Sequence, residues 1–229
     1  MGVNRTIRDL RYSVFYGLLL NRSYPLRSLG NAETECSWSF CPTGLDRDSV
    51  VYSGGVGNDI TFEHALVKHF GCKVILLDPS PTGLATMQRP EHQIPEFRFI
   101  PAGLAGQNGV LNLAPPQNAE EGSWYSQPAE ASKIQVPCHD LTTVMKQNGH
   151  TRIDLLKLDI EGSEYGVIDD ILARRIPVRQ ICVEYHHPFF PGIRLRDTVR
   201  SVLRLRLRGY KLLCQEGTNH TFLWSGRWP

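Results

Sequence analysis

The sequence lacks an apolar run long enough to cross a membrane. Its longest early apolar stretch, VFYGLLL at residues 14 to 20, falls far short of the ~20 residues that a spanning helix needs. The stretch follows Arg5, Arg8 and Arg11, as in a signal peptide, but the next residues, NRSYPL, contain no small-residue cleavage site. We therefore expect a helix over residues 5 to 20 that packs on the domain, no membrane span, and a cytoplasmic location.

The six cysteines lack the spacing of a zinc site or of a disulfide framework. They stand at positions 36, 41, 72, 138, 182 and 214, with no CxxC pair. This pattern favours a reducing compartment and thiols that are mostly free. The spacing leaves open whether Cys36 and Cys41 pair.

The chain also lacks an excess of charge of one sign. Its 25 Lys and Arg residues against 23 Asp and Glu residues leave a formal net charge of +2, which does not indicate a nucleic-acid partner. The basic segment 194–209 is interpreted as the solvated face of a helix. With 229 residues, of which 41% are apolar, the chain has the size and composition of one α/β domain.

Strand-like and helix-like segments alternate from residue 50 onward. Short apolar runs predict strands at 50–53, 73–77, 97–103, 154–160 and 179–185, with an additional strand at 109–114. Apolar residues at helical spacing predict helices at 60–70, 82–89, 139–148, 163–173 and within 194–209. The runs 210–215 and 220–225 predict a closing hairpin.

This alternation predicts one doubly wound domain with a mostly parallel sheet and helices on both faces. The closing hairpin is expected to add an antiparallel strand at one edge. Residues 1–48 are predicted to form the N-terminal helix and an irregular lead-in, and residues 49–229 the main domain. Ligands are expected at the carboxyl ends of the strands.

A glycine-rich turn, SGGVGND at residues 53–59, follows the first predicted strand and precedes a helix. Such a turn lets a ligand approach the backbone, and Asp78, 21 residues beyond Gly57, stands where an acid accepts bonds from ribose hydroxyls. A dinucleotide motif would need a third glycine where Ile60 stands. Asp59 suits a cationic ligand such as S-adenosylmethionine. The remaining alternative is a glycine turn without a ligand.

Acidic residues and histidines follow two later strands. Asp159 comes near the end of the apolar run DLLKLDI, and Glu161 and Glu164 follow it; Glu164 is interpreted as an acid of a helix's first turn. In VEYHHP, alternation places Glu184 and His186 on one side of the strand. These two residues could serve as a general base, complete a metal site with Asp159, or form a buried hydrogen bond that orders the loop.

The runs VVYSGGVGNDITFE, KVILLDPSP, IDLLKLDIEGSEYGVI and ICVEYHHP together resemble the FkbM-type S-adenosylmethionine-dependent methyltransferases. The most specific part is KLDIEGSE, which is similar to the family's K-[IL]-D-[IV]-E-G-x-E. The resemblance covers roughly residues 30 to 225. It implies a Rossmann-like class I fold with seven strands, mostly parallel, and an antiparallel terminal strand.

The resemblance also implies roles for individual residues. It places the methionine part of the cofactor at the glycine loop, the ribose at Asp78, adenine at the end of the third strand, and the methyl group beside Asp159. The loop here reads GGVGND in place of the family's common G-A-N-x-G. The resemblance implies that the cofactor is bound by Gly54, Gly55, Gly57, Asp78, Gly103 and Leu104. Asp59 is added to this set because its charge suits a cationic ligand.

These observations predict a methyltransferase that methylates an oxygen of a small-molecule or glycan-like acceptor. The candidate catalytic residues are Asp159, Glu184 and His186. A divalent metal is compatible with this set but is not favoured, because a Glu–His pair can orient itself without an ion. Trp124 and Tyr125, in the polar excursion 115–133, are candidates for the acceptor side. The alternatives are an NAD(P)-dependent oxidoreductase and an inactive interaction module of the same fold.

Overall fold

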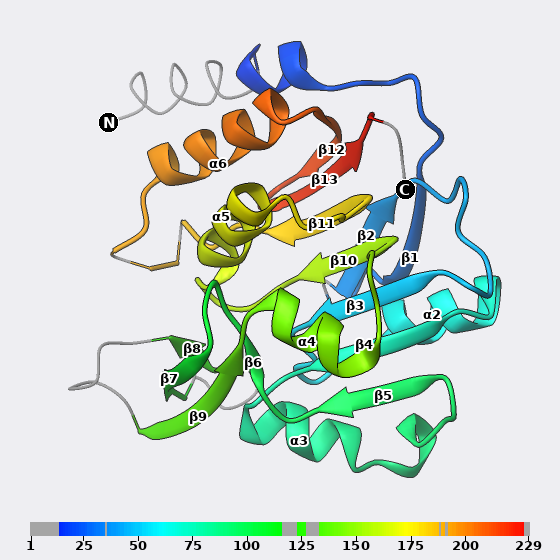
Figure 1. The fold of residues 1–229 in the computed structure, drawn as a ribbon, viewed down its shortest axis with the longest axis vertical. Helices are drawn as coiled ribbons and strands as arrows, with labels where there is room; N and C mark the ends of the chain where they lie inside the picture. Colours follow the sequence, from blue (N-terminus) through cyan, green and yellow to red (C-terminus); the bar gives the residue numbers. More distant parts are fainter. Residues whose placement is uncertain are drawn as a thin grey trace.

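The computed structural model describes residues 14–34, 36–115, 123–126, 133–187, 189–190 and 192–226. Its centre is a seven-stranded sheet, which Figure 1 shows with helices packed around it. The strands lie in the order β12 (Tyr210–Glu216), β13 (Asn219–Trp224), β11 (Gln180–Glu184), β10 (Leu155–Leu158), β3 (Val50–Gly54), β4 (Lys73–Leu77) and β5 (Phe97–Ile100).

The sheet has the mixed architecture predicted from the sequence. Strands β11, β10, β3, β4 and β5 run parallel to their neighbours, and β13 is antiparallel to both β11 and β12. The antiparallel strand was expected at the edge, but β13 lies one place inside it and β12 forms the edge. The strand order reverses between β3 and β10, so a crevice is expected beyond their carboxyl ends.

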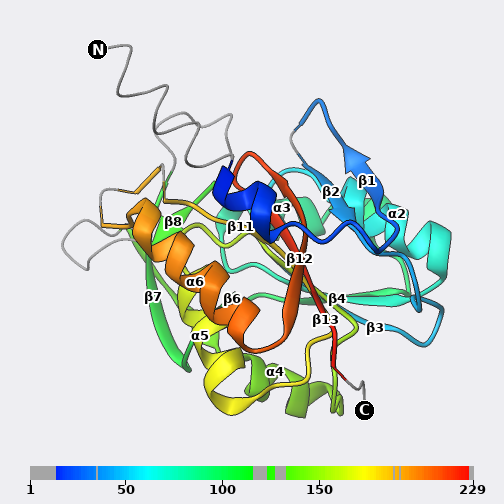
Figure 2. The ribbon, with the colours of Figure 1, turned by 90° about the horizontal axis from the view of Figure 1, so that it is seen from above.

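The two faces of the sheet carry separate hydrophobic cores. One face packs against α4 (Leu141–Asn148), α5 (Glu164–Arg174) and α6 (Leu195–Leu207), and the other against α2 (Thr61–Phe70), α3 (Pro81–Met87) and β2 (Cys36–Phe40). Figure 2 shows α4, α5 and α6 on one side and α2 with β1 and β2 on the other. The apolar runs of β3, β4, β10 and β11 are almost entirely buried, as the parallel-sheet interpretation requires, whereas β5 at the edge is partly exposed.

Local sequence explains where several helices begin and end. Ser80 and Asp140 accept hydrogen bonds from the backbone N–H groups of Gly83 and Thr143, which caps α3 and α4. α2 ends at Gly71, whose φ of 70° is left-handed. Each boundary lies within a few residues of the one predicted.

A second, four-stranded sheet lies beside the main one, in the order β6 (Gly103–Leu104), β9 (Ile134–His139), β7 (Gly109–Ala114) and β8 (Tyr125–Ser126). The single strand predicted over 97–103 is therefore wrong in its extent: β5 ends at Ile100 and the chain changes sheets at β6. The strand predicted at 109–114 is confirmed as β7. Figure 1 shows this second sheet next to the ends of the central strands.

The lead-in is more regular than the irregular segment expected over residues 21–48. β1 (Arg27–Asn31) pairs with β2 in an antiparallel register that places Leu29 opposite Trp38. Residues 14–19 are helical, and Tyr16 is buried against the main domain. The rest of the helix predicted over 5–20 lies outside the described residues, apart from Leu20, which bridges to Leu212.

All six cysteine side chains are free, including those of Cys36 and Cys41. Within the part of the chain that is described, no helix is both long and apolar enough to cross a membrane.

Candidate functional site

A large pocket opens at the carboxyl ends of β3 and β10, where the strand order reverses. Its volume is ≈ 1290 Å³. All ten residues singled out by the sequence as catalytic or cofactor-binding lie at or beside this pocket, and nine of them line it. Gly54, the tenth, ends β3 directly beneath it and pairs with Leu158 of β10.

The glycine turn after β3 is held against the turn after β10. Gly55 has a φ of 89°, and a Cβ there would lie 1.9 Å from the carbonyl oxygen of Asp159. Gly57 also has a positive φ, 54°, but a Cβ there would meet nothing within 4 Å. Gly55 is therefore required by close backbone packing, whereas Gly57 leaves open space at the pocket.

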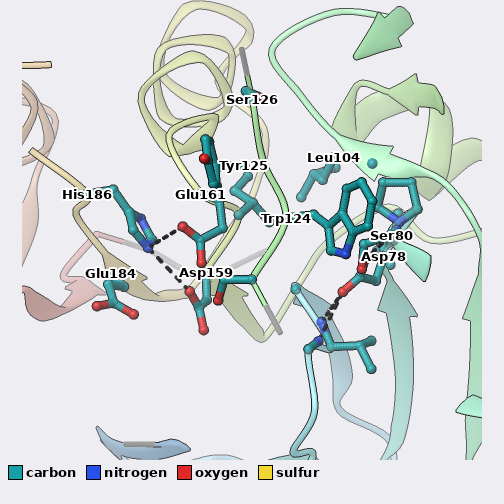
Figure 3. Close-up of a pocket in the computed structure, with 18 of the residues that line it drawn as sticks. Asp78, Ser80, Leu104, Trp124, Tyr125, Ser126, Asp159, Glu161, Glu184 and His186 are labelled. Carbon is teal, nitrogen blue, oxygen red and sulfur yellow. Dashed lines mark hydrogen bonds and ion pairs between the residues drawn. The ribbon is translucent and has the colours of Figure 1, made fainter. Parts of the chain in front are cut away.

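Asp78, at the end of β4, holds the glycine turn in place. Its Oδ2 accepts hydrogen bonds from the backbone N–H groups of Val56 (2.9 Å) and Gly57 (3.1 Å), and its Oδ1 accepts one from Ser80 N–H (2.8 Å). Figure 3 shows Asp78 and Ser80 beside Trp124. A carboxylate has about four acceptor positions, and these three hydrogen bonds leave one of them, on Oδ1, for a ribose hydroxyl.

The neighbouring part of the pocket is apolar. Gly103 and Leu104, in β6, are buried and line it together with Leu111 and Leu113. Figure 3 places Leu104 and Trp124 on the same side of the pocket as Asp78. This is the geometry expected of a space for a flat ring next to a ribose.

Asp59 lines the pocket but is already engaged. Its Oδ2 accepts a hydrogen bond from Thr34 Oγ1 (2.6 Å) and its Oδ1 accepts one from Thr61 N–H (2.7 Å) at the start of α2. Burial raises the pKa of Asp59, but these hydrogen bonds outweigh it and the net pKa lies below the usual value. The carboxylate is therefore ionised and still faces the pocket, as its sequence-based role requires.

The structure brings together the three residues predicted to be catalytic. Asp159 follows β10, Glu184 ends β11, and His186 comes two residues later. Each offers one ligand atom, and these atoms lie within 4.8 Å of one another, so the set has the composition of a divalent-metal site. Figure 3 shows the three side chains at the opposite end of the pocket from Asp78.

His186 makes a contact that the sequence did not predict. Its Nδ1 hydrogen-bonds Oε1 of Glu164, a fully buried carboxylate, rather than Glu184. Its Nε2 faces Asp159 Oδ1 at 3.7 Å and Glu161 Oε2 at 3.4 Å. Glu164 is thus a partner of His186, and not merely an acid in the first turn of a helix.

The side chains of Glu184 and His187 each contact a threonine instead of His186. Glu184 Oε1 accepts a hydrogen bond from Thr218 Oγ1 (2.9 Å), so the buried Glu184–His186 hydrogen bond considered for this loop is not formed. His187 turns the other way and contacts Thr198 Oγ1 on α6 (3.0 Å), as strand alternation predicts.

The acids around His186 control its charge. Burial lowers the pKa of His186, but the hydrogen bond to Glu164 and the neighbouring carboxylate charges outweigh it and raise the pKa to about 10. Burial, followed by the charge of Asp159, raises the pKa of Glu184 to about 7. Burial likewise raises the pKa of Glu161. The imidazole is therefore positively charged at neutral pH in the absence of a metal.

A buried lysine links the two ends of the site. Lys157, within β10, donates a hydrogen bond to the carbonyl oxygen of Gly55 (2.8 Å) and forms ion pairs with Asp159 (3.6 Å) and Glu63 (3.7 Å). Glu63 is 1% exposed and accepts a further hydrogen bond from Ser53. Neither Lys157 nor Glu63 was predicted from the sequence to belong to the site. The available signals were a lysine inside the apolar run LLKL and an acid on the buried face of α2.

Aromatic rings border the cluster on its open side. Tyr125 lies 5.6 Å from Phe190, and the rings of Phe189 and Phe190 each lie 5.8 Å from His186. Phe189 is 62% exposed, which is unusual for a ring of that size. We refer to Tyr125, Phe189 and Phe190 as the aromatic patch.

Comparisons with known proteins fit this geometry. The family model "Methyltransferase FkbM domain" matches residues 51–212. A protein of Rattus norvegicus described as "Probable methyltransferase-like protein 24" is 25% identical over 156 residues. That match covers 67% of this chain and 37% of the rat protein, so the chain spans well under half of the relative's length.

Two solved structures illustrate more distant likeness. A Streptococcus mutans protein described as a methyltransferase in complex with SAH has a TM-score of 0.45 and 12% identity, covering 78% of this chain and 88% of that chain. A fibrillarin pre-rRNA processing protein of Methanococcus jannaschii has a TM-score of 0.43 and 10% identity, covering 80% and 69%.

The family match spans the glycine turn, Asp78, the strand-end acids and His186, all of which lie at the pocket. The chain belongs to the FkbM methyltransferase domain family.

Proposed function

We propose that the protein transfers the methyl group of S-adenosylmethionine to a hydroxyl oxygen of a small-molecule or glycan-like acceptor. The observation that carries the proposal is one pocket with two chemically different ends. One end has the glycine turn and Asp78, and the other has the Asp159, Glu184 and His186 cluster. Its volume of ≈ 1290 Å³ exceeds the roughly 300–1,000 Å³ of a single-ligand site, so two ligands fit side by side.

The cofactor is proposed to occupy the end nearest the glycine turn. Its methionine part lies along Gly54, Gly55 and Gly57, with Asp59 near its positive charge, and one of its ribose hydroxyls donates a hydrogen bond to Asp78. Adenine lies in the apolar space at Gly103 and Leu104. The supporting observations are the close backbone approach at Gly55, the open space at Gly57, and the burial of Leu104.

The transfer itself needs the acceptor oxygen, the methyl carbon and the sulfur in line. The acceptor oxygen forms a bond to the methyl carbon while the carbon–sulfur bond breaks, and the sulfonium sulfur keeps the electron pair. The hydroxyl proton passes to a carboxylate of the cluster. Asp159 follows β10 and its backbone touches the cofactor turn, so we place the reacting oxygen beside Asp159, Glu184 and His186.

The aromatic patch supports a ring-shaped acceptor. Tyr125 and Phe190 lie next to the cluster, and their faces offer apolar surface to the C–H face of a sugar or to a small aromatic molecule. The exposed ring of Phe189 extends this surface toward solvent. A hydroxyl on a ring that stacks there reaches the cluster without burying the whole acceptor.

Two measurements test the proposal. Calorimetric titration should show saturable binding of S-adenosylmethionine and none of NADH, because Ile60 stands where a dinucleotide motif needs glycine. Acceptors should then be screened in matched pairs that differ only in a hydroxyl or an amino group at one carbon, with S-adenosylhomocysteine release as the readout. We expect release with the hydroxyl member. Release with amines alone would contradict oxygen methylation, and no release with cofactor bound would support the interaction-module alternative.

A further inference from the structure

We propose that Asp159, Glu184 and His186 bind one divalent cation of the Mg²⁺ or Mn²⁺ class. The inference rests on the proposed function, because such an ion would hold the acceptor oxygen beside the transferred methyl group. Two carboxylates and one imidazole, contributed from the ends of β10 and β11, place their ligand atoms within 4.8 Å of one another. This set leaves coordination positions open for an acceptor oxygen and water.

The ring of His186 is oriented for this role. Its Nδ1 is held by the buried carboxylate of Glu164, and its side chain is only 5% exposed. Its Nε2 is therefore directed at the cluster, as the dashed lines in Figure 3 show. A carboxylate on one ring nitrogen with the other nitrogen toward the ion is the usual arrangement around a metal-binding histidine.

The distances from Nε2 of His186 to the nearest carboxylates also support a shared cation. Asp159 Oδ1 and Glu161 Oε2 lie 3.7 and 3.4 Å from it, whereas charge-assisted hydrogen bonds are about 2.7–2.9 Å long. Neighbouring ligands of one ion lie about 3.0–3.4 Å apart when the metal–ligand bonds are near 2.1 Å. Glu161 is not one of the proposed ligands, but the 3.7 Å between Asp159 and His186 is longer than a charge-assisted hydrogen bond and shorter than the ~4.2 Å across such an ion, so these two atoms can share one cation.

Charge in the cluster is also unbalanced. Four carboxylates surround the imidazole: Asp159, Glu161, Glu164 and Glu184. Lys157, the other cation of the site, is already shared between Glu63 and Asp159. The proton of His186 and the cofactor's sulfonium each supply one positive charge, and an ion bound at Nε2 would replace that proton. Partly buried carboxylates need pairing or a metal, and a divalent cation would supply most of the missing charge.

A metal-free site was favoured from the sequence because a Glu184–His186 pair could orient itself without an ion. In the structure the pair is Glu164–His186, and Glu184 has a hydrogen bond from Thr218 instead. The hydrogen bond to Glu164 therefore orients His186 but does not orient Asp159 or Glu184. It leaves the carboxylates of Asp159 and Glu184 facing one another across the same space, which a cation would fill.

The test is a titration of the full chain with Mn²⁺, in which electron paramagnetic resonance measures the unbound ion, with and without S-adenosylmethionine. We expect one saturable site per chain. Asp159→Asn and Glu184→Gln should each weaken Mn²⁺ binding by about tenfold or more, and Glu164→Gln, which acts through His186, by about 10–100-fold. Asp48→Asn removes an exposed acid at the other end of the sheet and should leave binding unchanged.

Separate outcomes distinguish this inference from the proposed function. If the protein binds S-adenosylmethionine but shows no saturable Mn²⁺ site, only the metal inference is overturned. The same conclusion follows if Mn²⁺ binds and neither Asp159→Asn nor Glu184→Gln alters its affinity. Thermal unfolding of each variant identifies any that fails to fold, and the remaining variant then decides. If the folded wild-type protein binds no S-adenosylmethionine, the proposed function itself fails.

Discussion

Lys157 and Gly55 are joined by a partly buried hydrogen bond of 2.8 Å from the lysine ammonium to the glycine carbonyl oxygen. The bond ties the middle of β10 to the turn proposed to hold the cofactor. Because the same ammonium pairs with Asp159 and Glu63, one side chain fixes both the turn and the strand-end acid. Burial lowers the pKa of Lys157, but the charges of Glu63 and Asp159 outweigh it and raise the pKa overall, so the ammonium stays charged.

Replacing Lys157 by methionine should therefore destabilise the protein strongly. The change leaves the carboxylate of Glu63 buried without its cation, which costs about 3–5 kcal/mol of unfolding free energy. Denaturant unfolding measures the loss. The double variant Lys157→Met/Glu63→Gln should regain part of it, because no buried charge is then left unpaired. If the double variant is no more stable than the single one, the ion pair does not explain the stability.

The two glycines of the turn should respond differently to alanine. Gly55→Ala forces a Cβ to within 1.9 Å of the Asp159 carbonyl oxygen, so the turn must move and cofactor affinity should fall by at least about tenfold. Gly57→Ala meets no atom within 4 Å and carries only the strain of a positive φ, about 1 kcal/mol. Calorimetry with S-adenosylmethionine tests whether Gly55→Ala loses more affinity than Gly57→Ala. Equal affinity for both variants would contradict the prediction.

Asp78 is expected to contribute to cofactor binding in two ways, through the turn and through the ribose. Asp78→Ala should cost roughly 1.5–3 kcal/mol of S-adenosylmethionine binding, as for hydrogen bonds to a charged group. Asp78→Asn should cost less, because one oxygen can still accept from Val56 and Gly57 or from Ser80. Calorimetry measures the S-adenosylmethionine affinity of both variants. A wild-type affinity for Asp78→Ala would refute the ribose role.

The central sheet could be predicted because its strands are continuous apolar runs with clear stops. β1 could not, since its sequence RSLGN is short, largely exposed and free of alternation, and its partner β2 is fixed only by long-range packing. β9 does alternate, with Val136 and Cys138 buried, but Pro137 argues against a strand. Its proline is tolerated at an exposed position of the second sheet.

The site was predictable to the level of residues but not of contacts. Asp159 and Glu184 could be identified because each terminates an apolar strand, and parallel neighbours bring such ends together. The partner of His186 depends on where α5 begins relative to the end of β11, a packing relationship that local pattern does not encode. For this reason Glu164 was interpreted as a helix-end acid although its carboxylate contacts the histidine.

Asp159→Asn should separate binding from turnover. The amide keeps the size of the carboxylate, and the contact between the turns is made by the Asp159 backbone, so S-adenosylmethionine affinity should stay within a few-fold of wild type. The variant loses the charge that would orient the acceptor or accept its proton, and turnover should fall by about 100-fold or more. Steady-state kinetics with calorimetry on the same samples measures both quantities, and Asp48→Asn serves as the control. If Asp159→Asn keeps full turnover, Asp159 is structural and catalysis must depend on Glu184 and His186.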